Sequence, residues 1–260
     1  MKSLRINNDL RKVKILKGKQ RMWIFLMIIF VLLSACSTKE DQQDYTLDTK
    51  IGQMLMFGFR GKEVNEEWVQ AIHSQISQYH LGGILVLGYN VRSPQQTDSL
   101  MTFLHSAPQQ FPVLFAIDQE GGLVQRLSKS KGFTGFPSAQ KVADSLSVEE
   151  AYEMYRDLAK ECKDYGFNYI LAPVVDVNVN PESPAIGALG RSFSSNPAIV
   201  SSYAGAFIQA IEKEGLLSCL KHFPGHGSAN TDSHQGLTDV TQTWQPYELD
   251  PYTTLIGQGL

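Results

Sequence analysis

The chain contains 260 residues, of which 43% are hydrophobic, 10% aromatic and 19% charged. This composition excludes an intrinsically disordered chain, and the length fits one large globular domain. With three cysteines and a formal charge of −3 at pH 7, the chain is neither a disulfide-stapled scaffold nor a basic nucleic-acid-binding protein.

The amino terminus differs in composition from the rest of the chain. Residues 1–21 carry eight Lys or Arg side chains and one acid, and residues 22–33 form an apolar run. A basic segment followed by a run of this length is typical of an export signal, and it is short for a membrane-spanning helix of ~20 residues. The following LSAC sequence at 33–36 resembles a lipoprotein signal box. We therefore expect cleavage after residue 35 and lipidation of Cys36, with an uncleaved anchor helix as the alternative.

Removal of that segment leaves 15 basic and 25 acidic side chains, a formal charge of −10. A chain with this negative charge repels nucleic acid and anionic lipid, so acyl chains on Cys36 would have to hold the protein at the membrane. Residues 36–45 are polar and predict a tether, and residues 46–260 predict the folded domain. The expected location is the envelope of a bacterial cell, as an exported, membrane-anchored lipoprotein without a nucleic-acid partner.

Short apolar runs alternate with helical patterns through the predicted domain. Apolar residues recur at helical spacing in 64–79 and in 151–162, the latter after a capping box of Ser147 and Glu150. A third helix is predicted to begin at Pro197, behind Asn196 as its cap, and to end at Gly215. Residues 248–260 predict a further helix. The apolar runs predict five buried strands, at 54–59, 83–87, 113–117, 169–175 and 216–220.

Polar residues follow three of these predicted strands. Asp118, Gln119 and Glu120 follow the third strand, Asp176 the fourth, and Lys221-His222 the fifth. A β/α barrel carries its active site on the loops at the carboxyl ends of its strands. We predict an α/β fold of the (β/α)8 TIM-barrel type, of which this chain holds about five of eight units. An open doubly wound sheet is the alternative, although no Gly-rich phosphate-binding turn supports it.

The densest group of reactive side chains lies between residues 221 and 239. Their spacing does not match a pair of metal ligands on a helix face, so we expect neither a metal nor another cofactor. The group comprises Lys221, His222, His226, Asp232, His234 and Asp239.

This stretch resembles the signature of the family 3 glycoside hydrolases, in the branch that removes terminal β-linked N-acetylglucosamine. KHFPGHG at 221–227 and DSH at 232–234 carry the resemblance, which extends over residues 46–260. Further matches are IDQEGG at 117–122 with Arg126, PS at 137–138, LAPVVDV at 171–177 and GRSF at 190–193.

The resemblance implies a retaining exo-β-N-acetylhexosaminidase that acts on peptidoglycan or chitin-type fragments. A sugar-binding lipoprotein without catalytic activity and a β-glucosidase-type enzyme are the alternatives. The matching histidine is a general acid and base whose other ring nitrogen pairs with an aspartate, which departs from the carboxylate pair of most retaining glycosidases. By this resemblance His234 and Asp232 would be catalytic, Asp118 would accept from sugar hydroxyls, and Arg126, Arg191, Lys221 and His222 would donate to the sugar.

The nucleophile of this family is an Asp on a later strand, commonly in a Ser-Asp-Asp context. No such sequence follows residue 240. We therefore expect residues 36–260 by themselves to be poorly soluble and to turn over no aryl N-acetylglucosaminide.

Overall fold

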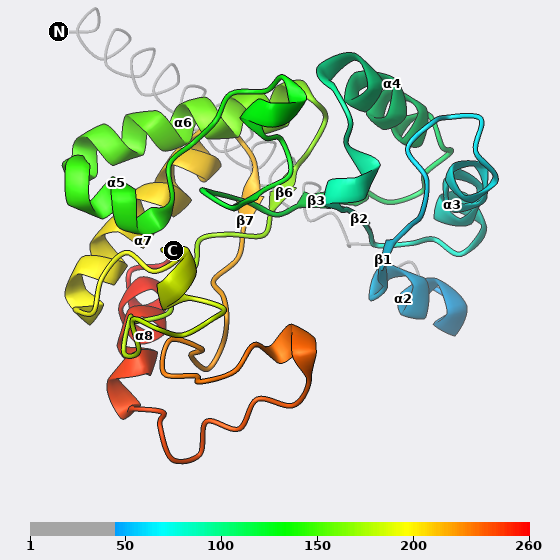
Figure 1. The fold of residues 1–260 in the computed structure, drawn as a ribbon. Helices are drawn as coiled ribbons and strands as arrows, with labels where there is room; N and C mark the ends of the chain where they lie inside the picture. The colour runs from blue at the N-terminus through cyan, green and yellow to red at the C-terminus, as the bar shows by residue number, and fades with distance from the viewer. Residues whose placement is uncertain (1–44) are drawn as a thin grey trace, which may run out of the picture. The chain divides into compact units, whose positions relative to one another are not determined.

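A computed structural model describes residues 45–260. The predicted signal segment, Cys36 and most of the predicted tether lie outside the described residues. One sheet of five parallel strands forms the centre of the domain, and its strand order follows the chain (Figure 1). Its strands are β1 (Met56–Gly58), β2 (Gly83–Val86), β3 (Leu114–Ile117), β6 (Tyr169–Ile170) and β7 (Leu217–Ser218).

Sequential parallel pairing is the winding of a β/α barrel, because each strand is followed by a crossover that returns the chain to the same end of the sheet. In register, Gly83 pairs with Met56 on one side and with Leu114 on the other. The prediction of an α/β fold with a parallel sheet of five strands is confirmed.

The last two strands are shorter than the predicted runs 169–175 and 216–220. The Ala172 backbone N donates within its own segment, to Ile170 O at 2.9 Å, so the regular ladder ends at Ile170 and only a bridge between Val174 and Lys221 follows. Backbone hydrogen bonds from Cys219 N to Ala172 O (3.1 Å) and from Lys221 N to Pro173 O (3.2 Å) keep the two segments side by side. The expectation that Cys219 lies in a buried strand was wrong, because it follows β7 and is half-buried.

The predicted helix boundaries are largely confirmed, because local side-chain hydrogen bonds set them. Ser147 Oγ accepts from Glu150 N at 3.2 Å, and Glu150 Oε2 accepts from Ser147 N at 2.8 Å. Asn196 Oδ1 accepts from Ala198 N at 2.9 Å. The helices are α2 (Leu47–Gln53), α3 (Glu67–Gln78), α4 (Pro94–His105), α5 (Ala139–Ser145), α6 (Val148–Asp164), α7 (Pro197–Lys213) and α8 (Asp250–Gly257).

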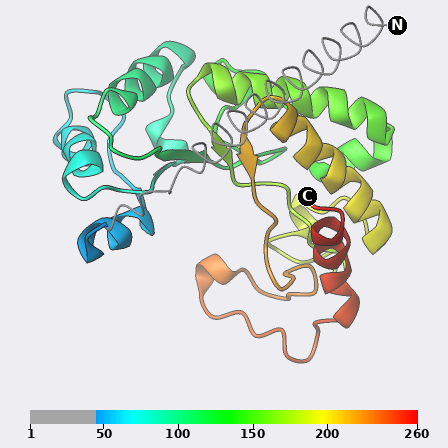
Figure 2. The same ribbon diagram turned by 180° about the vertical axis from the view of Figure 1, so that it is seen from behind.

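Apolar side chains of the helices cover the sheet and form one large core. In both views of the ribbon, α3 and α4 lie beside β1 to β3, whereas α6 and α7 lie beside β6 and β7 (Figures 1 and 2). Tyr155 of α6 and Phe207 of α7 are almost fully buried and meet edge to face, with ring centroids 4.7 Å apart. Within residues 45–260, no helix combines the length and apolar character that a membrane crossing requires.

A short antiparallel hairpin follows β3 and was not predicted. Its strands are β4 (Gln119–Gly121) and β5 (Val124–Gln125). Gly121 has φ +98°, and a Cβ at this position would lie 2.2 Å from the carbonyl oxygen of Pro137, so only glycine fits without rearrangement. The hairpin brings the residues after β3 back toward the end of the sheet.

Candidate active site at the carboxyl ends of the strands

Lys221 lies between two carboxylates that follow β3. Its Nζ is 2.9 Å from Asp118 Oδ1 and 2.6 Å from Glu120 Oε1, and only 16% of its side chain is exposed. Arg126 Nη2 approaches the other oxygen of Asp118 at 2.8 Å. Burial alone would raise the pKa of Asp118, but the charges of Lys221 and Arg126 and their hydrogen bonds outweigh burial and lower this pKa. Asp118 is therefore held ionised.

Glu120 also holds Arg191, which comes from the loop before α7. Arg191 Nε donates to Oε2 at 2.9 Å and Nη2 donates to Oε1 at 2.8 Å, a paired geometry that fixes the guanidinium plane. Arg191 Nη1 donates to the carbonyl of Ala185 at 2.8 Å. The sequence placed Glu120 among the polar residues after the third strand but not among the site residues. Its role depends on a partner 71 residues away.

His222 connects Arg191 to a buried aspartate that follows β6. Its Nδ1 is 2.7 Å from Asp176 Oδ2, and its Nε2 is 3.1 Å from Arg191 Nη2. Asp176 is completely buried and also accepts from the backbone N–H groups of His222 and His226. The structure thus joins five predicted sugar-binding residues into one network, namely Asp118, Arg126, Arg191, Lys221 and His222.

Asp232 and His234 form a separate pair on the long loop after β7. Asp232 Oδ1 accepts from the backbone N of His234 at 2.9 Å and contacts its Nδ1 at 2.7 Å. These backbone and side-chain hydrogen bonds lower the pKa of Asp232. The His234 side chain is 82% exposed, and Figure 2 shows its loop projecting in orange below the sheet.

A further contact links this loop to the network around Asp176. His226 Nε2 lies 3.2 Å from Ser233 Oγ, and the His226 backbone N donates to Asp176 at 2.8 Å. Among residues 45–260, no hydrogen bond or ion pair joins the Asp232–His234 pair directly to Lys221 or Arg191. No cluster of three or more His, Cys, Asp or Glu side chains in the described part of the chain could hold a metal ion.

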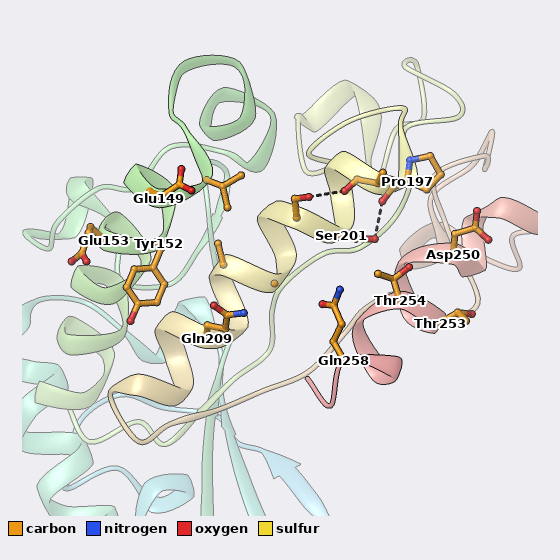
Figure 3. A pocket seen from close by; sticks show the side chains of 15 residues that line it. Glu149, Tyr152, Glu153, Pro197, Ser201, Gln209, Asp250, Thr253, Thr254 and Gln258 are labelled. Carbon is orange, nitrogen blue, oxygen red and sulfur yellow. Dashed lines mark hydrogen bonds between the residues drawn. The ribbon is translucent and has the colours of Figure 1, made fainter.

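One hollow in the described part of the chain lies away from these charged groups. It has a volume of about 890 Å³ and is formed by side chains of α6, α7 and α8 (Figure 3). Tyr152, Gln209 and Asp250 are among its lining residues, and none of the predicted site residues lines it. Chemistry based on ion pairs and imidazole therefore belongs to the strand ends and not to this hollow.

Residues 46–260 match the model of the glycosyl hydrolase family 3 N-terminal domain. The chain is 37% identical over 217 residues to β-hexosaminidase A of Pseudoalteromonas piscicida, which covers 76% of this chain and 36% of that protein. It is 35% identical to β-hexosaminidase LpqI of Mycobacterium tuberculosis, covering 81% of this chain and 52% of the relative. The chain thus spans about half or less of the length of these relatives.

A family 3 β-N-acetylglucosaminidase from Paenibacillus has a solved structure that superimposes with a TM-score of 0.70 at 30% identity. The superposition covers 84% of this chain and 41% of the solved one. The family model, the relatives and the winding of the sheet agree on the (β/α) barrel type of fold. The chain therefore belongs to glycosyl hydrolase family 3, and its residues 46–260 match the N-terminal domain of that family.

Proposed function

We propose that the protein hydrolyses terminal, non-reducing β-linked N-acetylglucosamine from peptidoglycan or chitin-type fragments, with retention of configuration. The observation that carries this proposal is the Asp232–His234 pair, with 2.7 Å between the carboxylate oxygen and Nδ1. The pair lies in a chain whose relatives are named β-hexosaminidases. The proposal includes export of the protein and a lipid anchor on Cys36, for which the sequence of residues 1–36 is the support.

Proton transfer would be the role of His234. When Asp232 accepts a hydrogen bond from Nδ1–H, it fixes the ring orientation and leaves Nε2 free to exchange a proton with a bound ligand. The same nitrogen can then protonate the leaving oxygen and later deprotonate the attacking water. The exposure of His234 supports access of the substrate to Nε2.

Sugar binding would be the role of the network around Lys221. Arg126, Arg191 and Lys221 present charged donors, while Asp118 is held ionised and accepts from hydroxyl groups. Several fixed polar groups around one terminal sugar would orient its anomeric carbon. No acetyl-binding group is assigned among them.

None of the buried carboxylates in the network is assigned as the nucleophile. Asp118 and Glu120 are each held by two cationic side chains, and Asp176 accepts from three donors. Such pairing favours a positioning role over attack at carbon, since a nucleophile must expose a lone pair to the substrate.

In a protein that also supplies the family's nucleophile, the test is the release of phenols from phenyl and 4-nitrophenyl β-N-acetylglucosaminides, with and without azide as an external nucleophile. His234→Ala should slow release by about 10² to 10⁴, and by less with 4-nitrophenol, because a good leaving group needs less protonation. His73→Ala, which removes a half-buried histidine of α3 outside the network, is the control. Equal losses with both substrates would remove His234 from the acid/base role.

Equilibrium binding of N-acetylglucosamine and glucose separates the remaining alternatives. Binding of N-acetylglucosamine without phenol release under either condition would favour a sugar-binding lipoprotein. A preference for glucose in both binding and release would favour a β-glucosidase-type enzyme.

A further inference from the structure

Asp176 receives three hydrogen bonds on one buried carboxylate. Its Oδ1 accepts from the backbone N of His222 at 3.3 Å and of His226 at 2.8 Å, and its Oδ2 is 2.7 Å from His222 Nδ1. The residue follows β6, whereas both histidines follow β7. Asp176 therefore ties two neighbouring strand ends together and also contacts an imidazole of the proposed sugar site.

Two neighbours determine the tautomer of His222. An ionised carboxylate can only accept a hydrogen bond, so the contact with Asp176 requires a proton on Nδ1. A guanidinium can only donate, so Nε2, 3.1 Å from Arg191 Nη2, must present its lone pair. The two constraints are independent and agree on the neutral ring with hydrogen on Nδ1.

We propose that Asp176 is a positioning residue that acts on Arg191 through the tautomer of His222. The carboxylate keeps the proton on Nδ1, and Nε2 then accepts from Arg191 Nη2, the same nitrogen that donates to Glu120 Oε1. This inference rests on the proposed function to the extent that Arg191 binds the sugar. It also gives His222 a role as an acceptor for Arg191, and because both ring nitrogens then have partners, this tautomer has no N–H left for the donation to the sugar that the family resemblance implied.

Asp176→Asn should change the tautomer of His222 without removing the backbone hydrogen bonds that Asp176 accepts. The Asn oxygen can replace Oδ1 and keep both backbone hydrogen bonds, but its NH₂ group then faces His222 Nδ1 as a donor. The ring proton must move to Nε2, where it meets an N–H of Arg191. Two donors that face each other repel, so the Arg191 guanidinium loses the hydrogen-bond acceptor that His222 Nε2 provides.

Nitrogen NMR of the full chain with ¹⁵N-labelled histidine reads this tautomer directly. The wild-type signals of His222, assigned by their loss in His222→Gln, should show a protonated Nδ1 and an unprotonated Nε2. Asp176→Asn should reverse the pattern, whereas Asp157→Asn on the exposed face of α6 should leave it unchanged. A wild-type His222 that carries its proton on Nε2 would overturn the proposal, and this result depends on no variant other than the His222→Gln used for the assignment.

Binding of N-acetylglucosamine then tests the positioning role. Asp176→Asn should weaken binding by about ten-fold, the worth of one hydrogen bond to a charged group, without loss of the folded circular dichroism spectrum. Unchanged affinity in a variant whose tautomer is reversed would refute the role of Asp176. If the wild-type chain shows the expected tautomer but binds no N-acetylglucosamine, the proposed function fails while the assignment of His222 stands.

Discussion

Lys221→Met is the substitution that best tests the electrostatics of the site. Methionine keeps most of the volume and removes the charge that pairs with both Asp118 and Glu120. Removal of one partner from a buried ion pair typically costs 3–5 kcal/mol, because the remaining charge stays buried. Here Asp118 keeps Arg126 and Glu120 keeps Arg191, so we expect the low end, a loss of about 3 kcal/mol in the free energy of unfolding at pH 7.

The loss should depend on pH in a defined direction. The pKa of Asp118 is lowered in the folded protein, so its contribution to stability is present above the unfolded value of ~3.9 and is lost as pH falls through the lower folded value. The difference between wild type and Lys221→Met should therefore be constant near neutral pH and shrink below about pH 4.

Urea unfolding followed by circular dichroism at pH 7 and at lower pH measures this difference. Lys160→Met is the matched control, because Lys160 pairs with Asp157 on the surface of α6 and both side chains are largely exposed. It should change the free energy of unfolding by less than about 0.5 kcal/mol. If Lys221→Met costs no more than this control at pH 7, the ion-pair network does not stabilise the fold as argued.

Three further substitutions test other parts of the account. Asp232→Ala should lower phenol release less than His234→Ala does, because Asp232 orients the imidazole and transfers no proton; an equal or larger loss in the same assay would contradict this role. Cys36→Ala should yield an unprocessed or soluble species in detergent partitioning, and continued partitioning into detergent after signal cleavage would contradict lipidation at Cys36. Gly121→Ala should lower the free energy of unfolding by more than about 1 kcal/mol in urea, because its φ is +98° and the new Cβ would meet Pro137 O, whereas no change would disprove the close approach.

Local signals in the sequence predicted α3, α6, α7 and α8, whereas α2, α4 and α5 were not predicted. The Ser147–Glu150 box and Asn196 before Pro197 set helix starts through contacts within three residues, which a sequence displays directly. The extent of the fourth and fifth strands was not predicted, because both runs are apolar throughout and the ladder ends where the Ala172 N–H turns back to Ile170 O. The β4–β5 hairpin was also missed, although Gly121-Gly122 is a turn signal that can reveal it.

In the site, too, the features that depend on neighbouring residues were predicted, and those that depend on residues distant in the chain were not. The resemblance to family motifs gave the charged residues, and the structure brings five of them together. The roles of Glu120 and Asp176 follow only from the fold, since Arg191 and His222 lie 71 and 46 residues further along the chain. Neither partner can be inferred from spacing in the sequence.

Calorimetric titration of the full chain with N-acetylglucosamine and with glucose tests the central claim most directly, since sugar binding requires only the network around Lys221. The account predicts that the wild-type chain binds N-acetylglucosamine, that Lys221→Met abolishes binding, and that Lys160→Met leaves it unchanged. Absence of binding to the folded wild-type chain, or equal binding by wild type and Lys221→Met, would contradict the account.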